Sequence, residues 1–226
     1  MFIPRLFEPI RSATVIPVRT SEDVSPADAE RIDRRRNEII GAAARLFSEK
    51  GYHETGIADI AAFLGIGHGT FYRYFKNKMD IASSAFDRVV ALLGSTMLGE
   101  DPESSNTIAE YREQVGRIVY RLFELLDTEP ALVRLFHRNS LDIDRLSGAM
   151  DEFTRYTERF IVNGVRKGFL RADLNTELAA QLLMAVLFDV TRRAAQQTPS
   201  AELRERLLTD GLDIIFLGLG ERPERR

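Results

Sequence analysis

From about residue 27 onward, apolar residues recur every three or four positions and show no sustained alternation with polar ones. Residues with this spacing share one face of an α-helix, whereas alternation is typical of a half-buried strand. One short stretch is representative, with Ile57, Ile60, Ala61 and Leu64 all falling on one face. The sequence therefore predicts an all-α fold of about nine helices.

Helix-breaking residues divide this pattern into regions. Four prolines lie in the first 26 residues, so residues 1–27 are expected to form a flexible N-terminal arm. Short helices follow over residues 28–77, and longer ones over residues 78–226. Basic last turns followed by glycine, at Lys50-Gly51-Tyr52 and Lys167-Gly168-Phe169, are typical helix ends. We therefore expect a small three-helix domain at 28–77 joined to a larger helical domain at 78–226.

Charge is unevenly distributed along the chain. The 226 residues carry a net charge of −3, but the segment from Arg31 to Asp80 contains nine basic and six acidic residues. This segment is therefore about +3 and the remainder about −6, by subtraction from the total. A basic module on an acidic scaffold is typical of a DNA-binding protein.

Several functional classes lack the residues that they need. The chain has no cysteine, and its three histidines are too scattered to predict a metal site. It contains no glycine-rich phosphate loop, no Ser-His-Asp arrangement and no metalloenzyme spacing, so we expect neither enzymatic activity nor a cofactor. No apolar run approaches the roughly 20 residues of a membrane helix, and the N-terminus lacks a secretory h-region. The expected location is the cytoplasm, with no membrane partner.

Residues 51–81 combine two short helices with a glycine-containing turn. In a helix-turn-helix of this form, the second helix lies in the major groove of double-stranded DNA and presents its N-terminal residues to the bases. The runs GYHETGIADIA (51–61), GIGHGTFYRYF (65–75) and KNK (76–78) resemble the signature of TetR-type repressors over about thirty positions. Elsewhere the resemblance is limited to length, helical character and helix order. It implies that this segment binds operator DNA.

The resemblance implies DNA contacts at His68, Gly69, Thr70, Tyr72, Arg73, Tyr74 and Lys78. Arg73 and His68 are the candidates for sequence readout, because an Arg fork can bind guanine and a histidine can donate or accept at a base edge. The hydroxyl groups of the threonine and the two tyrosines, and the ammonium group of Lys78, suit phosphate oxygens. Gly69 would let the DNA approach the backbone closely.

The residues around the two short helices carry further expectations. Gly65 and Gly67 are expected to permit the tight turn. Gly56 and Gly67 stand where the family pattern usually has a hydroxyl residue, so side-chain caps are expected to be missing from the starts of both helices. Thr55 is a further DNA-binding candidate, for a phosphate contact or for a cap from one residue earlier.

Two neighbouring features have simpler interpretations. Phe71 and Phe75 are expected to belong to the core beneath the second helix. The basic run of Arg34, Arg35 and Arg36 forms either a solvated helix face or a set of phosphate contacts.

Aromatic and methionine side chains recur at helical spacing along the middle helices of the second domain. Such a stripe is usually core, but pockets between helices are also mostly apolar. The resemblance implies a small-molecule pocket between the central helices. The ligand-binding candidates are Phe86, Tyr120, Phe123, Phe153, Tyr156 and Phe160.

The resemblance also implies that the last two helices pair across a two-fold axis to form a homodimer. The candidate interface consists of Leu178, Leu182, Ala185, Leu207, Leu212 and Ile215. The alternative is that these residues form an apolar stripe packed within one chain.

Together these observations predict a ligand-responsive transcriptional repressor with an N-terminal DNA-binding domain and a C-terminal ligand-binding and dimerisation domain. It would bind a palindromic operator as a homodimer and be released by a small apolar or amphipathic effector. The alternative is an all-helical ligand-binding or interaction protein without specific DNA recognition, which the missing hydroxyl caps leave open.

Overall fold

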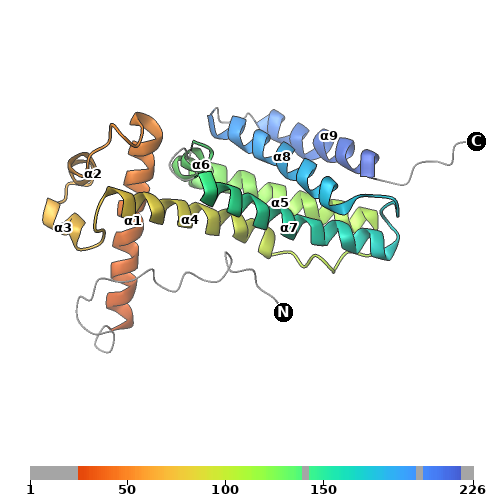
Figure 1. The fold of residues 1–226 in the computed structure, drawn as a ribbon, viewed down its shortest axis with the longest axis horizontal. Helices are drawn as coiled ribbons and strands as arrows, with labels where there is room; N and C mark the ends of the chain where they lie inside the picture. Colours follow the sequence, from red (N-terminus) through yellow and green to blue (C-terminus); the bar gives the residue numbers. More distant parts are fainter. Residues whose placement is uncertain (1–24, 139–142, 197–200, 220–226) are drawn as a thin grey trace, which may run out of the picture.

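The computed structural model describes residues 25–138, 143–196 and 201–219 (Figure 1). Within these ranges it contains nine helices and no strand, which confirms the predicted fold class. The helices are α1 (Pro26–Lys50), α2 (Ile57–Phe63), α3 (His68–Tyr72), α4 (Lys78–Leu98), α5 (Ile108–Thr128), α6 (Pro130–His137), α7 (Ile143–Lys167), α8 (Thr176–Gln196) and α9 (Ala201–Leu219). We call α1–α3 the head and α5–α9 the body.

The helix ends follow the signals in the sequence. Ser25 caps α1 by accepting a hydrogen bond from the amide of Asp28 at 3.1 Å, so the helix begins just inside the expected arm. Residues 1–24 of that arm lie outside the described residues. The glycines that follow α1 and α7 have φ angles of 97° and 78°, in a region that favours glycine. The predicted stops after Lys50 and Lys167 are therefore confirmed.

Helix α4 joins the head to the body. It contacts α1 of the head as well as α5 and α6 of the body (Figure 1). Its residues Ile81, Ala85 and Val89 are each 0% exposed, and one apolar cluster runs from α1 to α9. The boundary expected between residues 77 and 78 falls at the start of this shared helix, and the division into two domains stays a prediction.

The apolar character of α4 exceeds the sequence expectation. By length and composition alone α4 could cross a membrane, although no such run was expected. However, 56% of its most apolar 18-residue window is buried inside the molecule. A helix that packs against neighbours on several sides is apolar on several faces, so the central position of α4 accounts for its composition.

Candidate nucleic-acid interface and ligand pocket

The second helix of the helix-turn-helix, α3, is held in place by two phenylalanines. Phe71 and Phe75 are both 0% exposed, and their ring centroids lie 5.8 Å apart, which confirms their place in the core. The opposite side of α3 is therefore open to solvent. The exposed residues there are His68, Gly69, Tyr72 and Arg73. A side chain at Gly69 would project into open space, so the backbone at this point is open to close approach.

Only one of the two glycines in the turn between α2 and α3 has a backbone conformation that favours glycine. Gly65 has a φ of 62°, and the following amide, that of Ile66, donates to the carbonyl of Ala61 at 2.9 Å. Gly67 has a φ of −71°, which any residue can adopt, so the expected need for glycine in the turn is wrong at this position. Gly67 precedes α3 without a side-chain cap, as expected.

Thr55 is buried in this structure and is not part of the exposed surface of the helix-turn-helix. Its side chain is 0% exposed, and its hydroxyl donates to the carbonyl of Gly51 at 2.8 Å. The expected phosphate contact or cap is therefore wrong, because the end of α1 already binds this hydroxyl group. At the start of α2, the carboxylate of Asp59 instead accepts a hydrogen bond from the amide of Gly56 at 2.7 Å. This bond stabilises a helix start that lacks a hydroxyl cap.

Lys78 also lies differently from the expectation. Its Nζ donates to the carbonyl oxygens of Tyr52, His53 and Thr55 at 2.8, 3.3 and 3.0 Å. An ammonium group has three donors, so all three serve the loop between α1 and α2. In this conformation the ammonium group has no donor left for the expected phosphate contact. At the first turn of a helix a cation opposes the helix dipole, and the loop carbonyls offer it compensating negative charge.

Tyr74 and the basic run of α1 belong to the same packed region. Tyr74 is half-buried against the core, and its carbonyl accepts a hydrogen bond from Arg36 at 2.8 Å. Arg36 also donates to Ser84 Oγ at 2.9 Å and lies 4.3 Å from the ring centroid of Phe75. Arg36 therefore joins α1, the end of the head and α4. Of its neighbours, Arg34 is exposed and Arg35 pairs with Glu38.

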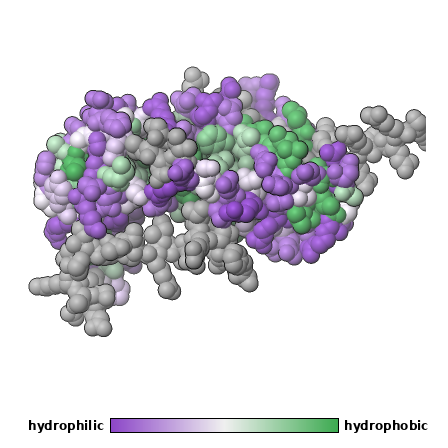
Figure 2. Space-filling view, in the orientation of Figure 1, coloured by the Kyte–Doolittle hydropathy of each residue, from purple (hydrophilic) through white to green (hydrophobic). Residues whose placement is uncertain are grey.

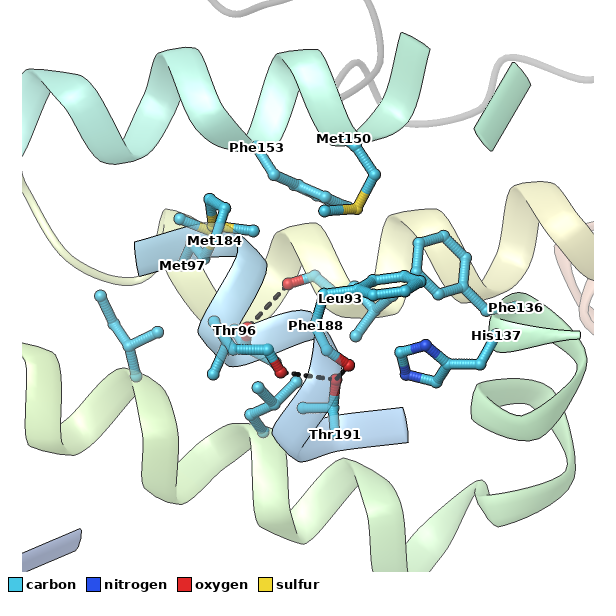
Figure 3. Close-up of a pocket in the computed structure, with 13 residues that line it drawn as sticks. Leu93, Thr96, Met97, Phe136, His137, Met150, Phe153, Met184, Phe188 and Thr191 are labelled. Carbon is cyan, nitrogen blue, oxygen red and sulfur yellow. Dashed lines mark hydrogen bonds between the residues drawn. The ribbon is translucent and has the colours of Figure 1, made fainter. Parts of the chain in front are cut away.

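A cavity of about 40 Å³ lies between α4, α5, α6, α7 and α8 (Figure 3). Its lining is almost wholly apolar. The lining residues are Leu93, Thr96, Met97, Ile118, Leu122, Phe136, His137, Met150, Phe153, Met184, Leu187, Phe188 and Thr191. We call this cavity the central pocket.

Only one of the six predicted ligand-binding residues, Phe153, lines the central pocket. Phe86 does not line the pocket but stacks on the lining residue Phe136, with ring centroids 5.9 Å apart. Tyr156 and Phe160 pack against each other in the core, with ring centroids 5.6 Å apart. These three residues do not line the cavity as it stands, because helical spacing identifies a buried face without identifying the space that it borders. Their role in ligand binding stays a prediction.

The other two candidates also lie outside the pocket lining. Tyr120 is 57% exposed on the outer surface of α5, and Phe123 is buried in the core. The sequence reasoning missed most of the actual lining, including His137. The methionines Met97 and Met184 were the available signal, since both lie in the aromatic and methionine stripe.

The polar groups of the central pocket differ in whether they are already bonded. The Thr96 hydroxyl donates to the carbonyl of Leu93 at 2.7 Å, and the Thr191 hydroxyl donates to that of Leu187 at 2.8 Å. His137 Nδ1 is buried and has no hydrogen-bond partner among the residues that the structure describes. Burial, and to a smaller extent the charge of Arg192, lower the pKa of His137 to about 4. The imidazole is therefore neutral at pH 7.

The expected dimer seam divides between two environments. Leu178 and Leu182 are 51% and 60% exposed on α8, beside the exposed Ala185. Figure 2 shows apolar side chains gathered over the end of the molecule where α8 and α9 lie. Leu212 is instead buried in the core of its own chain and Ile215 is half-buried against it, so their place in an interface stays a prediction. The side chain of Leu207 lies outside the described residues.

Comparisons with known proteins agree with this arrangement. The sequence pattern of bacterial regulatory proteins, tetR family, matches residues 39–85, which span the helix-turn-helix. The fatty acid metabolism regulator protein of Bacillus subtilis (strain 168) is 24% identical over 155 residues, which cover 66% of this chain and 78% of that protein.

Two solved structures share the fold. The fatty acid degradation regulator FadR from Bacillus halodurans superposes with a TM-score of 0.68 at 22% identity, covering 84% of this chain and 97% of that one. FadR from Bacillus subtilis, solved in complex with stearoyl-CoA, gives a TM-score of 0.66 at 24% identity, covering 81% and 98%.

Proposed function

We propose that this chain, whose residues 39–85 match the sequence pattern of bacterial regulatory proteins, tetR family, represses transcription from a near-palindromic operator until a small effector releases it. The observation that carries this proposal is the exposed side of α3, which a buried pair of phenylalanines holds in a fixed orientation. The role that we propose is that of a regulator rather than an enzyme.

The chemistry of the exposed side suits DNA. Arg73 and His68 reach solvent at opposite ends of α3 and would read base edges, while Tyr72, 50% exposed, would bind a phosphate. Thr70 is half-buried at the same surface and would add a second hydroxyl group. A helix of this length reads only a few base pairs, so high specificity requires two copies.

The exposed apolar face of α8 supports a homodimer. Leu178, Leu182 and Val186 are each more than half exposed, and Ile214 of α9 is 74% exposed. An apolar patch of this kind is typical of an interaction surface. We propose that a second copy covers it through a two-fold axis, which would place two α3 helices about one helical turn of DNA apart, or a multiple of it, roughly 34–36 Å.

The central pocket would hold the effector, and α6 would transmit its presence to the head. His137 and Phe136 of α6 line the pocket, while the next residue, Arg138, donates from Nη1 to the carbonyl of Ser48 in α1 at 2.7 Å. A ligand that displaces α6 would therefore shift α1. The stearoyl-CoA complex of the similar Bacillus subtilis protein supports an effector with an apolar body.

Selection from random-sequence DNA tests the proposal. The full chain is expected to enrich a near-palindrome, and Arg73→Ala is expected to select a less restricted sequence at one position in each half-site. Binding to all sequences alike, with no enriched motif, would support an interaction protein without specific DNA recognition and would overturn the proposal.

A further inference from the structure

We propose that the effector is an uncharged molecule with a narrow apolar body and one hydrogen-bonding group, which pairs with Nδ1 of His137 at the α6 end of the central pocket. This inference rests on the proposed function, because it identifies the chemistry of the ligand for the pocket described above. It concerns recognition of the ligand and is independent of which operator is bound.

Among the residues that the structure describes, the pocket lining contains no Asp, Glu, Lys or Arg. An ionised group that entered would lose its water without gaining a counter-charge, which is a large free-energy penalty. The charge that affects the pKa of His137 is that of Arg192, whose Nε already donates to Asp189 at 3.2 Å. The lining therefore selects against a carboxylate or phosphate inside the pocket.

His137 supplies the polar group that the pocket leaves unpaired. Both threonine hydroxyls on the lining donate to carbonyls of their own helices, whereas His137 Nδ1 is buried without a partner in the described part of the chain. A buried polar atom in this state destabilises the protein until it is bonded. A ligand group that forms a hydrogen bond with Nδ1 would remove that penalty. A ligand with such a group should therefore bind more tightly than one without it.

The imidazole is held in a defined orientation. Its ring centroid lies 4.5 Å from that of Phe188, at an interplanar angle of 65°, and 5.5 Å from that of Phe136. Figure 3 shows the ring extending from α6 toward Phe188 and Thr191 of α8. The neutral ring has one donor and one acceptor nitrogen, so it can pair with a hydroxyl or a carbonyl group without leaving a charge unpaired.

The remaining lining sets the shape of the apolar body. A cavity of about 40 Å³ is far below the roughly 300–1,000 Å³ of typical ligand pockets, so the walls must move to admit a ligand. Met97, Met150 and Met184 come from three different helices, and methionine is unbranched and adapts readily to a new shape. These side chains can open a narrow channel with little disturbance of the backbone. A linear chain fits such a channel better than a bulky ring system.

Four nine-carbon probes separate the effects of a polar group and of a charge on ligand affinity. Nonan-1-ol and nonan-2-one each have one uncharged polar group, nonane has none, and nonanoate is charged at pH 7.5. Calorimetric titration of the full chain with each probe is expected to show that the alcohol or the ketone binds at least about tenfold more tightly than nonane and nonanoate, a factor that corresponds to about 1.4 kcal/mol.

Variants at His137 assign this preference to its side chain. His137→Phe keeps an aromatic ring between Phe136 and Phe188 but removes the hydrogen-bonding nitrogen, so the polar and apolar probes should bind equally. His137→Gln restores a hydrogen-bonding group and should recover part of the preference. The matched control is His53→Phe on the exposed loop of the head, which should leave all four affinities unchanged.

Three results would overturn the inference: nonanoate binding as tightly as the alcohol, an unchanged preference in a folded His137→Phe variant, or no binding of any probe. None of them affects selection of an operator by the ligand-free protein. Loss of the enriched palindrome, by contrast, would overturn the proposed function while leaving the probe affinities intact. The two failures are therefore distinguishable.

Discussion

The ammonium group of Lys78 lies 4.3 Å from the ring centroid of Tyr52, and its Nζ donates to the carbonyl of the same residue at 2.8 Å. Lys78 begins α4 and Tyr52 lies in the loop between α1 and α2, so one side chain joins the shared helix to the loop that precedes the helix-turn-helix. Lys78 is therefore expected to stabilise this loop rather than to bind a DNA phosphate.

Lys78→Met is expected to lower the melting temperature and to weaken binding to all DNA sequences alike, because the loop before α2 loses its three hydrogen bonds. The slope of log affinity against log salt should stay unchanged, since no phosphate contact is lost. The exposed Lys76 provides the control through Lys76→Met, which should leave the melting temperature unchanged. A fall in the slope of about 0.9 in Lys78→Met would instead show a direct phosphate contact.

Arg73→Ala should act on specificity. The side chain is exposed at the end of α3, and its loss is expected to reduce affinity for the selected operator by roughly 1–3 kcal/mol while relaxing preference at one base position. Fluorescence anisotropy on the operator and on a scrambled duplex measures both effects. Equal losses on the two duplexes would contradict base readout by Arg73.

Two leucines that sequence spacing cannot tell apart should now behave differently. Leu182 is 60% exposed on α8, so Leu182→Glu is expected to give a folded monomer in analytical ultracentrifugation. Leu212 is 7% exposed, and its Cδ1 lies 3.6 Å from where a side chain at Gly116 would begin. Leu212→Glu should therefore reduce the free energy of unfolding by at least the roughly 2–5 kcal/mol that truncation of a buried leucine costs. A folded, dimeric Leu182→Glu variant would place the interface elsewhere.

Acid should destabilise the protein through His137. Its pKa is lowered to about 4 by burial and by Arg192, whereas an unfolded chain binds the proton near pH 6.5. Between these values the unfolded state holds the additional proton, so the free energy of unfolding should fall as the pH decreases from about 6.5 to about 4. His137→Phe should remove this component of the pH dependence, and His53→Phe should not. Parallel urea titrations at pH 7.5 and pH 5 test the difference.

Two glycines on α7 form a further matched pair. A Cβ at Gly164 would lie 2.6 Å from Leu170 Cδ1 and 2.8 Å from Phe169 Cε2, whereas one at Gly148 would meet open space. Gly164→Ala should therefore destabilise the body by roughly 1–3 kcal/mol through overpacking. Gly148→Ala should stabilise it by up to about 1 kcal/mol, the difference in helix propensity. Thermal unfolding should show a lower melting temperature for Gly164→Ala and a higher one for Gly148→Ala.

Local chemistry explains why much of the fold was predictable. The glycines after α1 and α7 adopt positive φ because a helix end favours that conformation and only glycine enters it freely, which depends on neighbouring residues alone. Phe71 and Phe75 lie on one face of a short segment, so burial of that face also determined which side of α3 stays open. For these features, the spacing within a few residues contains the necessary information.

The candidate sites required information from distant parts of the chain. Helical spacing identified the apolar faces of α5 and α7, but the central pocket exists only where five helices leave a gap, and Tyr120 of the predicted set lies on the outside. The conformation of Lys78 likewise depends on carbonyl groups more than twenty residues away in the sequence.

By itself, therefore, the sequence determined the helices, their ends and the exposed face of the helix-turn-helix. Tertiary structure alone decided that His137 borders a cavity, that Lys78 faces a loop, and that Leu182 is exposed while Leu212 is buried. The physical reason is that spacing along a helix specifies which residues share a face, whereas the neighbour that meets each face is set by packing between segments far apart in the chain.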